Sequence, residues 1–156
     1  MYETRMSHHV DAPPGAVYRA LLDADAVAVW RVPDGMRGQV HVFEAREGGR
    51  FRVSLTYETP TGTGKTAART DTYGGSFVRL VPDEQVVEEL AFETDDPALR
   101  TTMRITTTLR AADGGTDVLL VHEGVPDAVP ATDNETGTRM ALTHLAHYVE
   151  DRARRA

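Results

Sequence analysis

The chain has 156 residues, 40% of them apolar and none of them cysteine, and its 17 Lys and Arg against 24 Asp and Glu give a net charge of −7. This length predicts a single domain, residues 1–156, whose core needs no disulfide or metal to stabilise it. The absence of cysteine excludes thiolate metal sites and thiol nucleophiles. The acidic balance argues against a nucleic-acid partner. Because no long apolar run or signal-like segment occurs, we expect a cytoplasmic protein without membrane insertion.

The chain begins with a predicted strand and two short helices. Residues 3–10 suit a strand, and Asp11 is a candidate helix cap before two prolines that fit a first helical turn. Apolar residues then recur at spacings of three and four, which predicts a helix from near Pro13 to Asp23. A second short helix is predicted over residues 25–30.

Beyond these helices the apolar period changes from 3.6 to 2, which indicates strands. The clearest is residues 51–58, where apolar and polar residues alternate strictly. Residues 59–71 are rich in Gly and Thr and are predicted to form a long loop. Asp113-Gly114-Gly115 predicts a tight hairpin turn. The other strands are predicted over residues 39–46, 73–80, 85–93, 101–110 and 116–123.

One long amphipathic helix closes the chain. It is predicted to run from Asp133 or Asn134 toward Arg154, with Leu142 and Leu145 on its apolar side. A curved sheet cannot bury its concave face alone, so this helix must lie in it. The order of elements therefore predicts an α+β fold in which about six antiparallel strands follow two helices and precede a covering helix.

Several short strings, in this order and at this spacing, resemble one family. They are DAPPGAVYRAL at 11–21, Trp30, GGRF at 48–51, PDEQVV at 82–87, GGT at 114–116 and HEG at 122–124. Over nearly the whole chain they resemble the Hsp90-ATPase-activator-like (AHSA1-type) branch of the START/Bet v 1-like SRPBCC superfamily. The resemblance implies a helix-grip fold that encloses an apolar cavity between a curved antiparallel sheet and the C-terminal helix.

The resemblance implies no single activity, because superfamily members include lipid and hormone carriers, polyketide cyclases or aromatases, and co-chaperone domains. Eukaryotic Hsp90 activators also use an additional N-terminal domain, so we do not expect direct ATPase activation here. Members often open the last helix with a Gly-Trp pair, whereas this chain has Gly137-Thr138. The missing indole predicts a different or larger cavity mouth.

Strand alternation identifies candidate binding residues. If the apolar residues of three strands face the cavity, then Glu88, Thr107 and His122 face it too. An apolar pocket with a few polar groups is the usual small-molecule site, so we expect a small hydrophobic or amphipathic ligand, no metal and no cofactor, with residues 59–71 gating entry. The residues expected to contact it are Trp30, Phe43, Phe51, Val53, Leu55, Tyr57, Tyr73, Leu90, Phe92, Met103, Ile105, Leu120, His122, Met140 and His144.

Two other functions stay open at this point. Glu88 and His122 are a candidate pair for general acid and base chemistry of the cyclase or aromatase type. In the contrary arrangement, Glu88 lies in water near a strand end and His122 bonds to the backbone. A chaperone-binding module would instead use an exposed patch on the outer face of the sheet and enclose no cavity. A homodimer is compatible with all of these functions.

Two further patterns have weaker support. The GTGKT string at residues 62–66 ends like a phosphate-binding loop but lacks the first glycine and the following helix, which favours a flexible loop. His144 and His147 stand three apart on the last helix, close enough to share a metal ion. Without a third ligand, we expect one of them to edge the cavity and the other to be solvated.

Overall fold

The computed structural model describes residues 1–58 and 70–155, which contain seven strands and three α-helices. In chain order they are β1 (Tyr2–Val10), α1 (Pro14–Leu21), α2 (Ala24–Trp30), β2 (Met36–Phe43), β3 (Arg50–Tyr57), β4 (Thr70–Val81), β5 (Gln85–Phe92), the 3-10 turn η1 (Pro97–Leu99), β6 (Met103–Ala112), β7 (Gly115–Val125) and α3 (Ala131–Arg155). None of the helices described is both long and apolar enough to cross a lipid bilayer.

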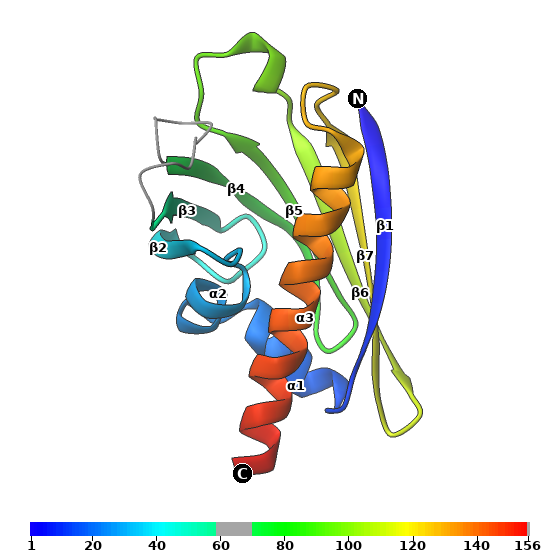
Figure 1. Ribbon diagram of the computed structural model, residues 1–156. Helices are drawn as coiled ribbons and strands as arrows, with labels where there is room; N and C mark the ends of the chain where they lie inside the picture. Colours follow the sequence, from blue (N-terminus) through cyan, green and yellow to red (C-terminus); the bar gives the residue numbers. More distant parts are fainter. Residues whose placement is uncertain (59–69, 156) are drawn as a thin grey trace.

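The seven strands form one antiparallel sheet in the order β1-β7-β6-β5-β4-β3-β2. Irregularities in the pairing of β1, β2 and β4 bend the sheet, because a bulged strand gains local twist. In Figure 1, α3 lies across one face of this sheet, with α1 and α2 beside its C-terminal half. The predicted α+β helix-grip fold is therefore confirmed.

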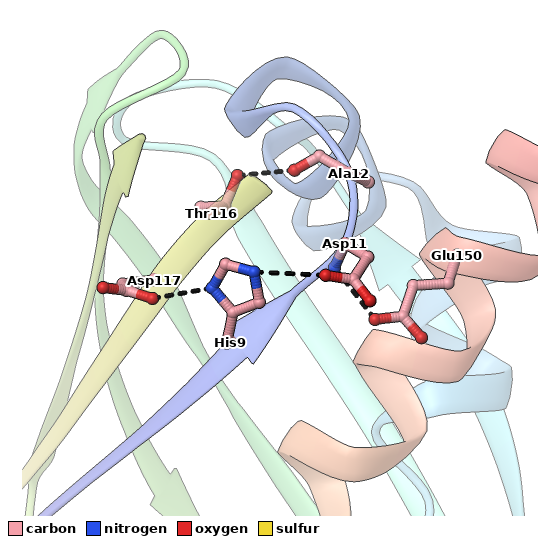
Figure 2. Close-up of polar contacts among 6 residues, drawn as sticks. All are labelled: His9, Asp11, Ala12, Thr116, Asp117 and Glu150. Atoms are coloured by element: carbon pink, nitrogen blue, oxygen red, sulfur yellow. Dashed lines mark hydrogen bonds and ion pairs between the residues drawn. The ribbon is translucent and has the colours of Figure 1, made fainter. Parts of the chain in front are cut away.

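The entry into α1 differs from the sequence prediction. Pro13 occupies the N-cap position without any side-chain cap, and Asp11 does not cap the helix. The backbone N–H of Asp11 instead donates to a carboxylate oxygen of Glu150 on α3, 2.9 Å away. Beside it, Thr116 Oγ1 on β7 donates to the Ala12 carbonyl at 2.7 Å (Figure 2). Contacts with α3 and β7 therefore fix the chain here, where a local cap was expected.

Three elements also begin earlier in the chain than the sequence predicted. The first backbone bonds of α3 are accepted by the Pro130 carbonyl, so the helix begins at Ala131, before the predicted start. β2 begins at Met36, three residues earlier than predicted, where it pairs with Tyr57. β4 begins at Thr70, because pairing with β3 extends it into the predicted loop. The rest of that predicted gate, with the 62–66 motif, lies outside the described residues.

Candidate functional site

A cavity of about 660 Å³, partly open to solvent, lies between the sheet and α3. Its walls come from β3 to β7, from the segment after α2 and from the N-terminal half of α3, and most of their surface is apolar. The helix wall includes Gly137 and Thr138. An apolar, partly enclosed space of this size is typical of a small-molecule site.

Most of the residues predicted to contact a ligand line this cavity. Glu88, Thr107 and His122 all line the cavity. Glu88 pairs with Ile105, and Ile105 pairs with His122, so the three side chains form one row across β5, β6 and β7. The other predicted residues that line the cavity are Trp30, Leu55, Tyr57, Tyr73, Leu90, Phe92, Met103, Ile105 and Leu120. That these residues contact a ligand stays a prediction.

Five of the predicted residues lie outside the cavity lining. Phe51 and Val53 are buried in the packed core, and the Phe43 and Phe51 rings lie 5.5 Å and 5.2 Å from the Phe77 ring. Met140 Sδ lies 3.1 Å from the backbone nitrogen of Asp34. His144 Nε2 lies 3.0 Å from Asp34 Oδ1. Alternation identifies the face of a strand, but it does not show where along that face the packed core ends.

Sequence reasoning missed Arg31, which lies immediately after α2. Its Nη1 donates to Glu88 Oε1 at 2.8 Å, and both side chains are largely buried, with exposed fractions of 17% and 8%. Its guanidinium carbon lies 5.2 Å from the centre of the Tyr73 ring. Burial opposes the charge, but the Glu88 carboxylate and Tyr73 outweigh this effect and raise the pKa of Arg31. No local sequence pattern links Arg31 to Glu88, because the pair forms only on folding.

The Tyr73 side chain brings a polar atom into the apolar wall. Tyr73 is 5% exposed and lines the cavity, and its hydroxyl has no hydrogen-bond partner among the described residues. Burial is the main cause of its raised pKa, and Glu88 adds to it while Arg31 opposes it. At neutral pH the phenol is therefore protonated and can donate a hydrogen bond.

His122 is held in one tautomer by its neighbours. Its Nδ1 lies 3.1 Å from Asn134 Nδ2, and Asn134 Oδ1 accepts a hydrogen bond from Thr4 Oγ1 at 2.5 Å. Because the amide nitrogen can only donate, Nδ1 must accept, and the ring proton sits on Nε2, 3.3 Å from Met103 Sδ. Burial first, and then the charge of Arg31, lower the pKa of His122 to about 4. The imidazole is therefore neutral at pH 7.

Comparison with known proteins identifies the family. The sequence model described as "Activator of Hsp90 ATPase homolog 1-like protein" matches residues 11–150. The chain belongs to this AHSA1 family. Similar solved structures include a protein from Chromobacterium violaceum, with 33% identity, a TM-score of 0.85 and coverage of 96% of this chain and 97% of that chain. No curated protein gives a significant match.

More distant structures share the fold of this AHSA1-family chain. An AHSA1-like protein from Aeromonas hydrophila is 17% identical, with a TM-score of 0.73 over 97% of this chain and 94% of that chain. A protein from Rhodobacter sphaeroides is 21% identical, with a TM-score of 0.77 over 93% of this chain and 90% of that chain. At these identities the likeness establishes the architecture and leaves the activity open.

The geometry of the AHSA1-family cavity does not favour acid–base catalysis by Glu88 and His122. The two residues lie two strands apart, about 9–10 Å, with Ile105 between them. The ion-pair partner of Glu88 is Arg31, and not the imidazole of His122 that the acid–base alternative requires. A histidine with a pKa of about 4 is also a weak base and is not charged at neutral pH.

The histidine pair of α3 does not form a metal site in the described structure. His144 bonds to Asp34, while His147 is exposed. Among residues 1–58 and 70–155, no group of three or more His, Asp or Glu is arranged to hold a metal ion.

Proposed function

We propose that this protein binds a small hydrophobic or amphipathic molecule in the cavity under α3. The observation that supports this most is a space of about 660 Å³ with a mainly apolar wall and a small set of buried polar groups. Burial of about 300 Å² of apolar ligand surface, at about 25 cal/mol per Å², would contribute about 7.5 kcal/mol before the cost of immobilising the ligand.

The wall is suited to ligands of varied shape. Met103 and Leu55 are flexible or branched apolar side chains, and Tyr57, Phe92 and Trp30 add aromatic surface. Thr138 lines the cavity and takes less room there than the indole that the family resemblance led us to expect, which favours a bulky ligand. Glu88 and His122 are the groups proposed to orient its polar end.

Mass spectrometry of the freshly purified protein under native conditions tests this function. We expect a retained small molecule, or an increase in Tm with members of a library of apolar compounds, because a ligand that binds only the folded state stabilises it. If no retained mass is found and no compound in the library raises the Tm, the proposal is wrong.

The two alternatives from the sequence stay predictions with less support. A cyclase or aromatase activity needs Glu88 and His122 to act together. The distance between the two residues and the ion pair of Glu88 with Arg31 do not favour this. A chaperone-binding role follows from the family's description, but the version predicted here requires a filled interior, which the cavity disfavours. Cytoplasmic location and homodimer formation also stay predictions.

A further inference from the structure

The ion pair of Arg31 and Glu88 leaves hydrogen-bonding atoms of both residues unused. One hydrogen bond joins the two side chains, from Arg31 Nη1 to Glu88 Oε1 at 2.8 Å. Within residues 1–58 and 70–155, Arg31 Nε and Nη2 and Glu88 Oε2 take part in no hydrogen bond. A guanidinium carries several N–H donors, and each carboxylate oxygen can accept more than one bond. The pair therefore keeps both donors and an acceptor for a further group.

These unused atoms are accessible from the cavity. Among the described residues, the side-chain nitrogen and oxygen atoms that are wholly enclosed and lack a hydrogen bond are Tyr73 Oη and His144 Nδ1. Glu88 Oε2 and the free nitrogens of Arg31 are not wholly enclosed, so they retain accessible surface. Glu88 lines the cavity from β5, an interior strand of the sheet, and Arg31 lines the same cavity. A ligand held there can therefore contact both residues.

We infer that this pair binds an uncharged group that both accepts and donates hydrogen bonds, such as a carboxamide, at the polar end of an otherwise apolar ligand. The carbonyl oxygen accepts from a free N–H of Arg31, and the amide nitrogen donates to Glu88 Oε2. This inference rests on the proposed function and specifies the ligand class. Hydrogen bonds to charged groups in a poorly solvated site are stronger than those between neutral groups.

The pair selects against a charged ligand group. Arg31 and Glu88 carry opposite charges 2.8 Å apart, so the pair has no net charge. A ligand carboxylate that approached Arg31 would lie near the Glu88 carboxylate, and a ligand ammonium that approached Glu88 would lie near the guanidinium. Each would lose its hydration in a mainly apolar cavity without gaining an unpaired counter-charge from the pair. A neutral dipolar group avoids this cost.

Four fluorescent probes with substituents of similar size test the inference: pyrenecarboxamide, acetylpyrene, pyrenecarboxylate and isopropylpyrene. Their binding is measured by energy transfer from Trp30, the single tryptophan, which lines the cavity. We expect the wild type to bind the amide about three- to tenfold more tightly than the ketone, because the ketone lacks the N–H donor. The carboxylate should bind most weakly.

Two changes to the pair should alter this order. Glu88→Gln leaves the Arg31 charge unpaired, so the carboxylate should bind about tenfold more tightly than it binds the wild type. The double variant Arg31→Met with Glu88→Leu removes both polar groups, so the amide should lose its advantage over the ketone while isopropylpyrene binds as it does to the wild type. If Glu88→Gln does not fold, the double variant still tests the inference.

Glu89→Gln is the matched control. Glu89 follows Glu88 on β5, points to the opposite face of the sheet and bonds there to Arg104, so the same substitution breaks an ion pair outside the cavity. This variant should keep the wild-type order of affinities. If the wild type binds the amide no more tightly than the ketone, or if this advantage survives in the double variant, the inference is wrong and the binding function stands. If none of the four probes binds the wild type, both are wrong.

Discussion

Arg31 and Glu88 lie 57 residues apart in the chain, yet the guanidinium and the carboxylate meet at 2.8 Å inside the cavity. Desolvation of two charges offsets much of their attraction, so such a pair contributes little net stability compared with apolar residues of similar size. It does fix the end of α2 against β5 and so gives the cavity a defined polar wall. We regard positioning, more than stability, as the role of this ion pair.

Replacing only one residue of the Arg31–Glu88 pair is therefore expected to lower the free energy of unfolding more than replacing both. Glu88→Ala should lower the free energy of unfolding by about 3 kcal/mol, because it leaves the Arg31 charge buried and unpaired. The double variant Arg31→Met with Glu88→Leu should lie within about 1 kcal/mol of the wild type. Urea denaturation measures both values. A double variant as unstable as Glu88→Ala would contradict this account.

Filling the cavity should abolish ligand binding without unfolding the protein. Leu55→Trp places an indole in the cavity from a half-buried position on β3, so the increase in Tm caused by a bound ligand should disappear. Met103 is only 1% exposed, and Met103→Trp should overpack the core and cost about 1–3 kcal/mol. Thermal shift assays compare these variants with Val29→Trp, a control at a position that is 60% exposed. Ligand stabilisation that persists in Leu55→Trp would argue against this cavity as the site.

The stability of the protein should fall as the pH rises, because His9 then loses its proton. Its Nδ1 lies 2.8 Å from Asp117 on β7 and its Nε2 lies 3.2 Å from Asp11, so the ring joins two carboxylates (Figure 2). The hydrogen bond to Asp117 first, with a further contribution from Asp11, raises the pKa of His9 above 6.5. Its contribution is therefore complete below pH 6.5 and is lost as the pH rises through the folded-state pKa.

Replacement of His9 by Asn is expected to flatten the dependence of Tm on pH across that window. His8→Asn is the control, because His8 points to the opposite face of β1. The ring of His9 is partly exposed, so the effect should also weaken as salt is added. An identical pH profile for wild type and His9→Asn would refute this role.

On the acid side, we expect His122 to contribute to the loss of stability. Burial lowers its pKa from 6.5 to about 4, so the folded state resists protonation that the unfolded chain accepts. The stability due to the neutral ring is present above pH 6.5 and falls by up to about 3 kcal/mol as the pH drops to 4. Denaturation of His122→Gln at several pH values should show a shallower acid loss than the wild type. An equally steep loss would assign the acid sensitivity to other groups.

The sequence by itself determined which face of the sheet each side chain occupies. Successive residues of a strand point to opposite faces, so the apolar partners of Glu88, Thr107 and His122 were enough to place all three toward the cavity. The apolar stripe of the last segment likewise showed that a helix covers the sheet. These are consequences of local backbone geometry, which a short window of residues encodes.

Only the tertiary structure decided which groups meet. Arg31 reaches Glu88, Asp11 bonds to Glu150 rather than capping α1, and Phe51 packs in the core beyond the end of the cavity. Each outcome depends on how distant elements pack, because an ion pair or a core contact requires loop closure that no local pattern encodes. The periodicity of the backbone fixes the direction in which each side chain points. The packing of the helices on the sheet decides which side chains contact one another and where the cavity ends.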